Sequence, residues 1–114
     1  MSKRDEKIEA MIAEAKKLNL NISDDLITKV VISLGPSVYN KDAEVVACGQ
    51  PAELDRVKNN FLKKKLGLTN DDAELDKAIK EVCEQLGTSN RSKKRVHMYA
   101  LLAMKFNKTD VYDA

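Results

Sequence analysis

Apolar and polar residues repeat with a helical period along most of the chain. In the two N-terminal stripes the apolar side chains recur three or four positions apart, which places each set on one helix face. Ser2 and Ser23 are placed to cap these helices, and Gly35-Pro36 is placed to end the second. The stripes consist of Ile8, Met11, Ile12, Ala15 and Leu18, and of Leu26, Ile27, Val30, Val31 and Leu34.

The least regular stretch runs from Gly35-Pro36 to Pro51, with turn-forming residues at both ends. Within it, Lys41–Cys48 predicts a short helix with Asn40 as its cap. A strand around Val45–Val46 is the weaker alternative, because a lone strand has no partner in an otherwise helical chain.

Three further helices follow. The first of them has Pro51 at its first helical position. The second starts at Asn70, Asp71 or Asp72. The third starts at Thr88, Ser89 or Asn90 and runs to about Phe106. Leu-Gly pairs at 34–35, 66–67 and 86–87 end helices, and a glycine with positive φ accounts for all three. The buried stripes are Leu54, Val57, Phe61, Leu62 and Leu66; Leu75, Ala78, Ile79, Val82, Cys83 and Leu86; and Val96, Tyr99, Ala100, Leu102, Ala103 and Phe106, widened by Leu101 and Met104.

These elements predict an all-α fold of five main helices plus one short helix, arranged as a compact bundle or orthogonal array. The connections are short, and residues 1–114 fit one domain of ordinary size. The last helix is apolar nearly all round, so we expect it at the centre of the core.

Composition supports a soluble globular chain, with 43% hydrophobic and 33% charged residues and a net charge of +2. These values exclude a collagen, a disulfide scaffold, a membrane span and a histone-like basic chain. The N-terminal segment has no apolar core of the secretory kind, which favours the cytoplasm. In that reducing compartment we expect Cys48 and Cys83 to be buried, unbonded thiols, with a disulfide as the alternative.

The chemistry-bearing residues are few, and we expect no catalytic residue, cofactor or metal. The single histidine, His97, lies on the flank of the last helix beside Lys93 and Lys94. A general base would need an orienting carboxylate, and these neighbours have the wrong sign. Two cysteines and one histidine without a Cys-x-x-Cys pair do not make a zinc site.

A basic cluster marks the predicted start of the last helix, where the helix dipole disfavours cations. Two explanations stay open. The cluster forms an anion site for a phosphate, a nucleic-acid backbone or a partner's carboxylate, or its cations pair with acids such as Glu81 and Glu84 on a neighbouring helix. The candidate residues are Ser89, Asn90, Arg91, Lys93, Lys94 and Arg95.

A second candidate is the loop of Tyr39, Asn40, Lys41 and Asp42, because binding residues often collect on loops. The alternative is structural: Tyr39 packs on the core, and Asn40 and Asp42 cap the short helix.

The segments GPSVYNKDAEVVA, PAELDRVKNNFLKKKLGL and GTSNRSKKRVHMYALLAMKF make the chain similar to a small bacterial family of all-helical, single-domain proteins of unknown function. The resemblance covers nearly the whole chain. It implies a bacterial cytoplasmic protein and brings no activity, cofactor or catalytic residue. Gln50 stands where the family pattern leads us to expect an aspartate cap, which weakens one helix start.

Taken together, these features favour a non-enzymatic binding or protein-interaction module. The alternative is binding of an anion or a nucleic-acid backbone through the basic start of the last helix. No feature indicates a membrane partner, and the oligomeric state is open. A protein-interaction module predicts an exposed apolar patch, whereas phosphate binding predicts a continuous basic face.

Overall fold

Local signals in the sequence set the ends of the first helices. The computed structural model describes residues 3–35, 39, 44–87, 90 and 93–112, so the Ser2 cap lies outside the described residues. Helix α1 spans Lys3–Lys17 and α2 spans Asp24–Leu34. Ser23 caps α2 as predicted, because the Leu26 N–H donates to its Oγ at 3.1 Å. The three glycines predicted to end helices have positive φ angles: +62° at Gly35, +66° at Gly67 and +108° at Gly87.

The helix predicted after Pro51 forms, but it changes type along its length. It is an α-helix over Pro51–Arg56 (α4) and a π-helix over Val57–Lys65 (η2). The apolar residues Val57, Phe61, Leu62 and Leu66 are buried, and their spacing of four, one and four residues suits the wider turn of a π-helix. Gln50 makes no side-chain capping bond to α4, as its poor capping chemistry predicts.

The last helices differ from the prediction at one boundary. Helix α5 spans Asp72–Gln85, α6 spans Arg95–Lys105, and a final 3₁₀ turn, η3, spans Thr109–Tyr112. The start of α5 is as predicted, because the Glu74 N–H donates to Asp71 Oδ1 at 3.1 Å. The predicted start of α6 near residues 88–90 is wrong, since the first helical residue is Arg95 and Lys94 is the N-cap.

The short helix predicted over Lys41–Cys48 is wrong from Val45 onward. Asn40 and residues 41–43 lie outside the described residues. Val45 pairs with Lys94 in an antiparallel bridge, and the Val46 N–H donates to the Lys93 carbonyl at 2.8 Å. This extended pairing was the weaker alternative, and its partner is the segment before α6 rather than another strand.

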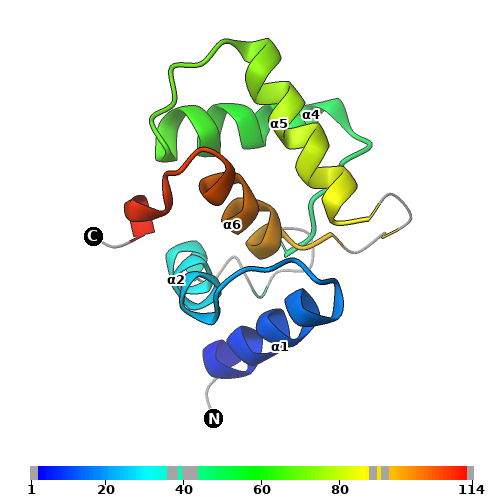
Figure 1. Cartoon of the computed structure of the whole chain (residues 1–114), viewed down its shortest axis with the longest axis vertical. Coiled ribbons are helices and arrows are strands. Elements are labelled where there is room, and N and C mark those ends of the chain that lie inside the picture. The colour runs from blue at the N-terminus through cyan, green and yellow to red at the C-terminus, as the bar shows by residue number, and fades with distance from the viewer. Residues whose placement is uncertain (1–2, 36–38, 40–43, 88–89, 91–92, 113–114) are drawn as a thin grey trace.

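Helix α6 lies at the centre of the molecule, as predicted (Figure 1). It packs against α1, α2, α5 and η3, while η2 packs on α5. The side chains of Ala100, Leu102 and Ala103 are fully buried. Met104 was assigned to the same buried face, and that assignment is wrong because it is 40% exposed. The fold is all-α, and its radius of gyration of 13.2 Å is that of one compact domain of this length.

Candidate functional site

The cations that flank the start of α6 are tied to distant carboxylates. Lys94 Nζ lies 3.4 Å from Glu14 Oε1 on α1, and the Arg95 guanidinium bonds the Glu53 carboxylate on α4. Both basic side chains are only 13–14% exposed. For Lys94 and Arg95 these contacts support the ion-pair explanation rather than the anion site.

The carboxylates that pair with Lys94 and Arg95 are Glu14 and Glu53, rather than the Glu81 and Glu84 suggested from the sequence. Glu81 accepts instead from Lys105 Nζ on α6, at 2.8 Å. The hydrogen bond and charge of Lys105 lower the pKa of Glu81. Glu84 is exposed on α5, and the partners of Lys94 and Arg95 come from α1 and α4.

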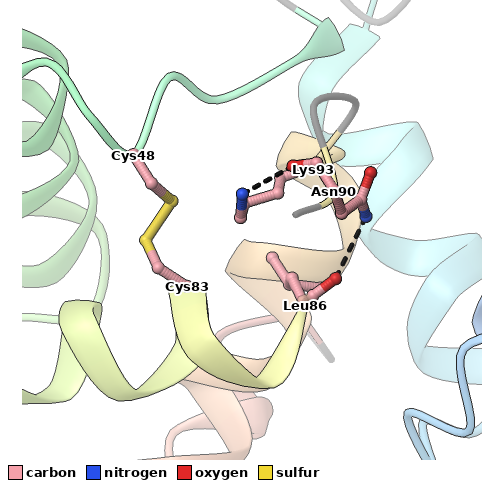
Figure 2. Close-up of a disulfide and its surroundings, with 5 residues drawn as sticks. All are labelled: Cys48, Cys83, Leu86, Asn90 and Lys93. Atoms are coloured by element: carbon pink, nitrogen blue, oxygen red, sulfur yellow. Dashed lines mark hydrogen bonds between the residues drawn. A yellow bond between two sulfur atoms is a disulfide. The ribbon is translucent and has the colours of Figure 1, made fainter. Parts of the chain in front are cut away.

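Two further members of the basic cluster, Asn90 and Lys93, lie between α5 and α6 (Figure 2). The Asn90 side-chain amide donates to the Leu86 carbonyl at 3.0 Å, and Lys93 Nζ donates to the Asn90 carbonyl at 2.6 Å. Ser89 and Arg91 lie outside the described residues. Because α6 begins at Arg95 with Lys94 as its N-cap, Asn90 lies four residues before the cap and Lys93 directly before it. The anion site formed by the whole cluster stays a prediction.

Arg95 also organises the aromatic side chains beside it. Its guanidinium donates to Tyr99 Oη at 3.1 Å, and the Tyr99 ring stacks on Phe61 with ring centres 3.9 Å apart. Burial lowers the pKa of Arg95, but the hydrogen bond to Glu53 and the contacts with Tyr99 outweigh it and leave that pKa above its ordinary value. These contacts join α4, η2 and α6, so this cation stabilises the fold.

His97, on the last helix, is fully buried. Its Nε2 lies 2.9 Å from the Met11 carbonyl, so the neutral ring donates from Nε2. Its Nδ1 makes no hydrogen bond and lies 3.8 Å from Glu14 Oε2. Burial is the main cause that lowers the pKa of His97, and Lys94 adds to it. The carboxylate that a general base would need therefore lies near the ring, but the ring has no access to solvent.

The lysines of η2 divide between the interior and the surface. Lys58 is only 9% exposed, and its Nζ lies 3.2 Å from Asp76 Oδ1 on α5. The hydrogen bond to Asp76 raises the pKa of Lys58. Lys63 Nζ lies 2.7 Å from Asp72 Oδ1, and this bond lowers the pKa of that carboxyl. The acids at the start of α5 thus bind η2 as well as favouring the helix dipole.

The second candidate region, the loop at residues 39–42, is described only at Tyr39. That side chain is 41% exposed, so the prediction that Tyr39 packs on the core is wrong. Asn40, Lys41 and Asp42 lie outside the described residues, and their suggested roles stay predictions.

The two cysteines form a disulfide, so the prediction of unbonded thiols is wrong (Figure 2). The Cα atoms of Cys48 and Cys83 are 6.2 Å apart, a separation that a disulfide spans without backbone movement. The bond joins the turn before α4 to the last turns of α5. The separation of 35 positions in sequence gave no sign of this proximity, which depends on how α4, η2 and α5 fold back.

The feature that sequence reasoning missed is a groove along α2 and the C-terminal half of α6. A pocket of about 420 Å³ has Ile22 and Leu26 as apolar lining and Met104 beside them. A second pocket, of about 270 Å³, adjoins it at Lys29 and extends to Ile32 and η3. A third, also of about 270 Å³, adjoins it at Met104 and extends to α5. We call these three pockets together the α2–α6 groove.

The α2–α6 groove combines exposed apolar side chains with lysines. Ile32 is 49% exposed and Met104 is 40% exposed, and among the described residues only Tyr39 is a comparably exposed large apolar side chain. The charged residues that line the groove are Asp25, Lys29, Lys65 and Lys105. Lys29 pairs with Asp25 at 3.0 Å, whereas Lys65 donates to Ser33 Oγ at 3.1 Å and lies over the Tyr112 ring.

Two further observations concern the described part of the chain. No three His, Cys, Asp or Glu side chains in it come close enough together to hold a metal ion. None of its helices has the length and apolar character needed to cross a bilayer.

Comparison with known proteins identifies a family but no activity. No curated protein is similar enough to this chain to count as a relative. The model of one family, described as "Protein of unknown function (DUF2853)", matches residues 9–110. The resemblance to a small family of unknown function is therefore confirmed, while its bacterial origin stays a prediction. The chain belongs to the DUF2853 family.

Proposed function

We propose that this protein is a non-enzymatic interaction module that docks a segment of a partner protein in the α2–α6 groove. One observation carries the proposal: two of the most exposed large apolar side chains of the described residues, Ile32 and Met104, line neighbouring hollows that share Lys29. Exposed apolar surface that is hollowed and rimmed by polar residues is typical of a recognition site.

The charge of the groove points to an acidic, amphipathic partner segment. Three lysines line it against one aspartate. Carboxylates of a partner would be attracted to Lys29, Lys65 and Lys105, while its apolar side chains fill the hollows beside Ile32 and Met104. The contacts Lys29–Asp25, Lys65–Ser33 and Lys105–Glu81 are solvent-exposed, and such contacts are weak enough to exchange for others.

A library of random peptides displayed on phage tests this proposal without a known partner. We expect panning to enrich sequences in which Asp or Glu alternates with large apolar residues. Ile32→Glu and Met104→Glu should each weaken binding of the enriched peptides by at least about tenfold, roughly 1.4 kcal/mol. Tyr39→Glu is the matched control, because Tyr39 is equally exposed but does not line the groove.

The outcomes separate the docking site from the chemistry of its occupant. Peptides that bind the Ile32→Glu and Met104→Glu proteins as well as the unaltered one would contradict the groove. Enrichment of basic or uncharged peptides that depend on Ile32 would retain the groove and contradict an acidic partner.

We also propose a cytoplasmic location, with the charged, globular composition as support. Disulfides in that compartment are usually transient or redox-sensing. Fractionation of cells that produce the untagged protein tests the location, and recovery in the periplasmic or secreted fraction would contradict it.

A further inference from the structure

Residues 44–50 form a clasp that ties three distant parts of the molecule together. Glu44 accepts from Lys7 Nζ on α1 at 2.9 Å. Val45 and Val46 pair with the residues just before α6. Cys48 is bonded to Cys83 on α5 (Figure 2). The disulfide is the one covalent tie in this set, and the other ties described for the clasp are an ion pair, a short β-bridge and apolar contacts.

We propose that Cys48–Cys83 is a site of reversible thiol–disulfide exchange with a dithiol, and that its reduction loosens the clasp from α5 while the helical core stays folded. This proposal is independent of the α2–α6 groove. It concerns the C-terminal end of α5, whereas Lys58 and Lys63 contact acids near the N-terminal end of that helix.

The two cysteines differ in exposure, and we infer the direction of the exchange from this difference. Cys48 is half-buried in a turn whose next residues, Gly49 and Gln50, are exposed. Cys83 is only 9% exposed on the buried face of α5. Attack by a thiolate requires access to one sulfur of the bond. The Cys48 sulfur is therefore the site of attack, and Cys83 is the leaving group.

The exchange balances with a dithiol as the only co-reactant. One thiolate of the dithiol attacks Cys48 Sγ, the Sγ–Sγ bond breaks, and Cys83 leaves as a thiolate that takes up a proton. The mixed disulfide now joins Cys48 to one sulfur of the dithiol. The second thiolate of the dithiol attacks that sulfur, and Cys48 leaves as a thiolate that is protonated in turn. The protein gains two electrons and two protons, and the dithiol becomes a disulfide.

The reduced protein keeps the features that hold the core. The largest fully buried side chains include Ile27, Leu62, Leu75 and Leu102, and none of these belongs to the clasp, whose one buried core residue is the smaller Val46. A reduced Cys83 remains on the buried face of α5 as a small hydrophobe.

Reduction should act most strongly on the pairing of the clasp with the segment before α6. The Val46 N–H donates to the Lys93 carbonyl, so its hydrogen exchange reports whether the clasp is closed. The Leu86 N–H, which donates to Val82 in the last turn of α5 at 2.9 Å, is a control on the element that carries Cys83.

The test uses the purified, unaltered chain, whose two cysteines are its only thiols. The protein is equilibrated with mixtures of reduced and oxidised dithiothreitol, and the free thiols are counted by maleimide labelling and mass spectrometry. Circular dichroism and hydrogen exchange are measured on the fully oxidised and fully reduced samples. A Cys48→Ala, Cys83→Ala double variant serves as a permanently reduced form.

We expect a single reversible transition between no label and two labels in the folded protein, with unchanged helical content. Exchange at Val46 should accelerate at least tenfold on reduction, and in the double variant, while exchange at Leu86 changes less than threefold. A bond that reduces only after unfolding in urea would overturn the proposal. So would loss of helical structure on reduction, or an unchanged exchange rate at Val46.

Discussion

The starts of α5 and α6 are built in opposite ways. Helix α5 begins at a local signal: Asp71 caps it, and Asp72 and Glu74 lie in its first turn, where the dipole favours carboxylates. Helix α6 begins at Lys94 and Arg95 without a side-chain cap, and the dipole disfavours both cations. Its first residues are held by Val45, Glu14 and Glu53, which come from other parts of the chain.

The difference shows that a helix start can depend on tertiary contacts alone. The α5 start should be less sensitive to changes elsewhere in the molecule, because its cap, Asp71, is a neighbouring residue, although Asp72 also pairs with Lys63 of η2. The α6 start should respond to changes at α1, α4 and the clasp, because those elements hold it. Two cations of the basic cluster, Lys94 and Arg95, thus have carboxylate partners within the protein.

The largest expected effect comes from breaking the Arg95–Glu53 pair. Arg95→Met leaves the Glu53 carboxylate largely buried without its main partner, and removing one member of a buried pair costs about 3 kcal/mol. Arg56→Met is the matched control, since Arg56 contacts the same Glu53 at 3.5 Å but is 73% exposed. That variant should lose no more than about 0.5 kcal/mol.

Urea unfolding followed by circular dichroism measures both variants. Arg95→Met combined with Glu53→Leu should cost less than the sum of the two single changes, because the double variant buries no lone charge. Equal losses for Arg95→Met and Arg56→Met would show that the α6 start does not depend on this pair.

The same contrast explains how much of the fold the sequence could predict. The boundaries at Ser23, Asp71, Gly67 and Gly87 were predictable because capping and positive-φ chemistry act within a few residues. The α6 start was misplaced because Ser89 and Asn90 resemble local caps, whereas the true boundary depends on Val45, more than forty positions away.

The candidate sites were less predictable for a related reason. The basic residues were identified, but not their partners Glu14 and Glu53. The burial of His97 and the disulfide both depend on which helices meet. The α2–α6 groove depends on the shape left where α2, α6 and η3 pack, and no periodic pattern records a hollow.

The burial of His97 next to the α6 start predicts a pH effect of intermediate size. Because burial lowers its pKa in the folded state, the unfolded chain binds a proton more readily as the pH falls below about 6.5. Stability is therefore fully present above that pH and is lost toward lower pH, by up to about 1.4 kcal/mol per pH unit. Glu14 and Lys94 are the charged groups that act on the ring, with opposite signs.

Unfolding measured between about pH 5 and pH 7 tests the His97 effect. His97→Gln keeps a side-chain N–H donor but does not titrate, so its stability should vary less with pH than that of the unaltered protein. The carboxyls of Asp72 and Glu81 titrate below their ordinary values of 3.8 and 4.5, outside this interval. If the stability of both proteins varied equally with pH, the pH effect could not be assigned to His97.

A smaller effect is expected from the local start of α5. Asp71→Ala removes the acceptor for the Glu74 N–H and should cost about 1 kcal/mol, the usual value for a lost N-cap. Asp71→Asn keeps a side-chain oxygen at the cap and should cost much less. If Asp71→Asn is as harmful as Asp71→Ala, the charge of this residue matters more than its hydrogen bond.

The smallest net effect is expected from giving α6 the local start that it lacks. Lys94→Ser removes the contact with Glu14 and adds a hydroxyl that can accept from a backbone N–H of the first turn. The ion pair is only partly shielded, since Glu14 is 29% exposed, so its loss and the gain of a cap should cancel to within about 0.5 kcal/mol. A loss above about 1 kcal/mol in urea unfolding would exceed any partly exposed ion pair. It would mean that Lys94 fixes the α6 start through its tertiary contacts, and that a local cap cannot replace them.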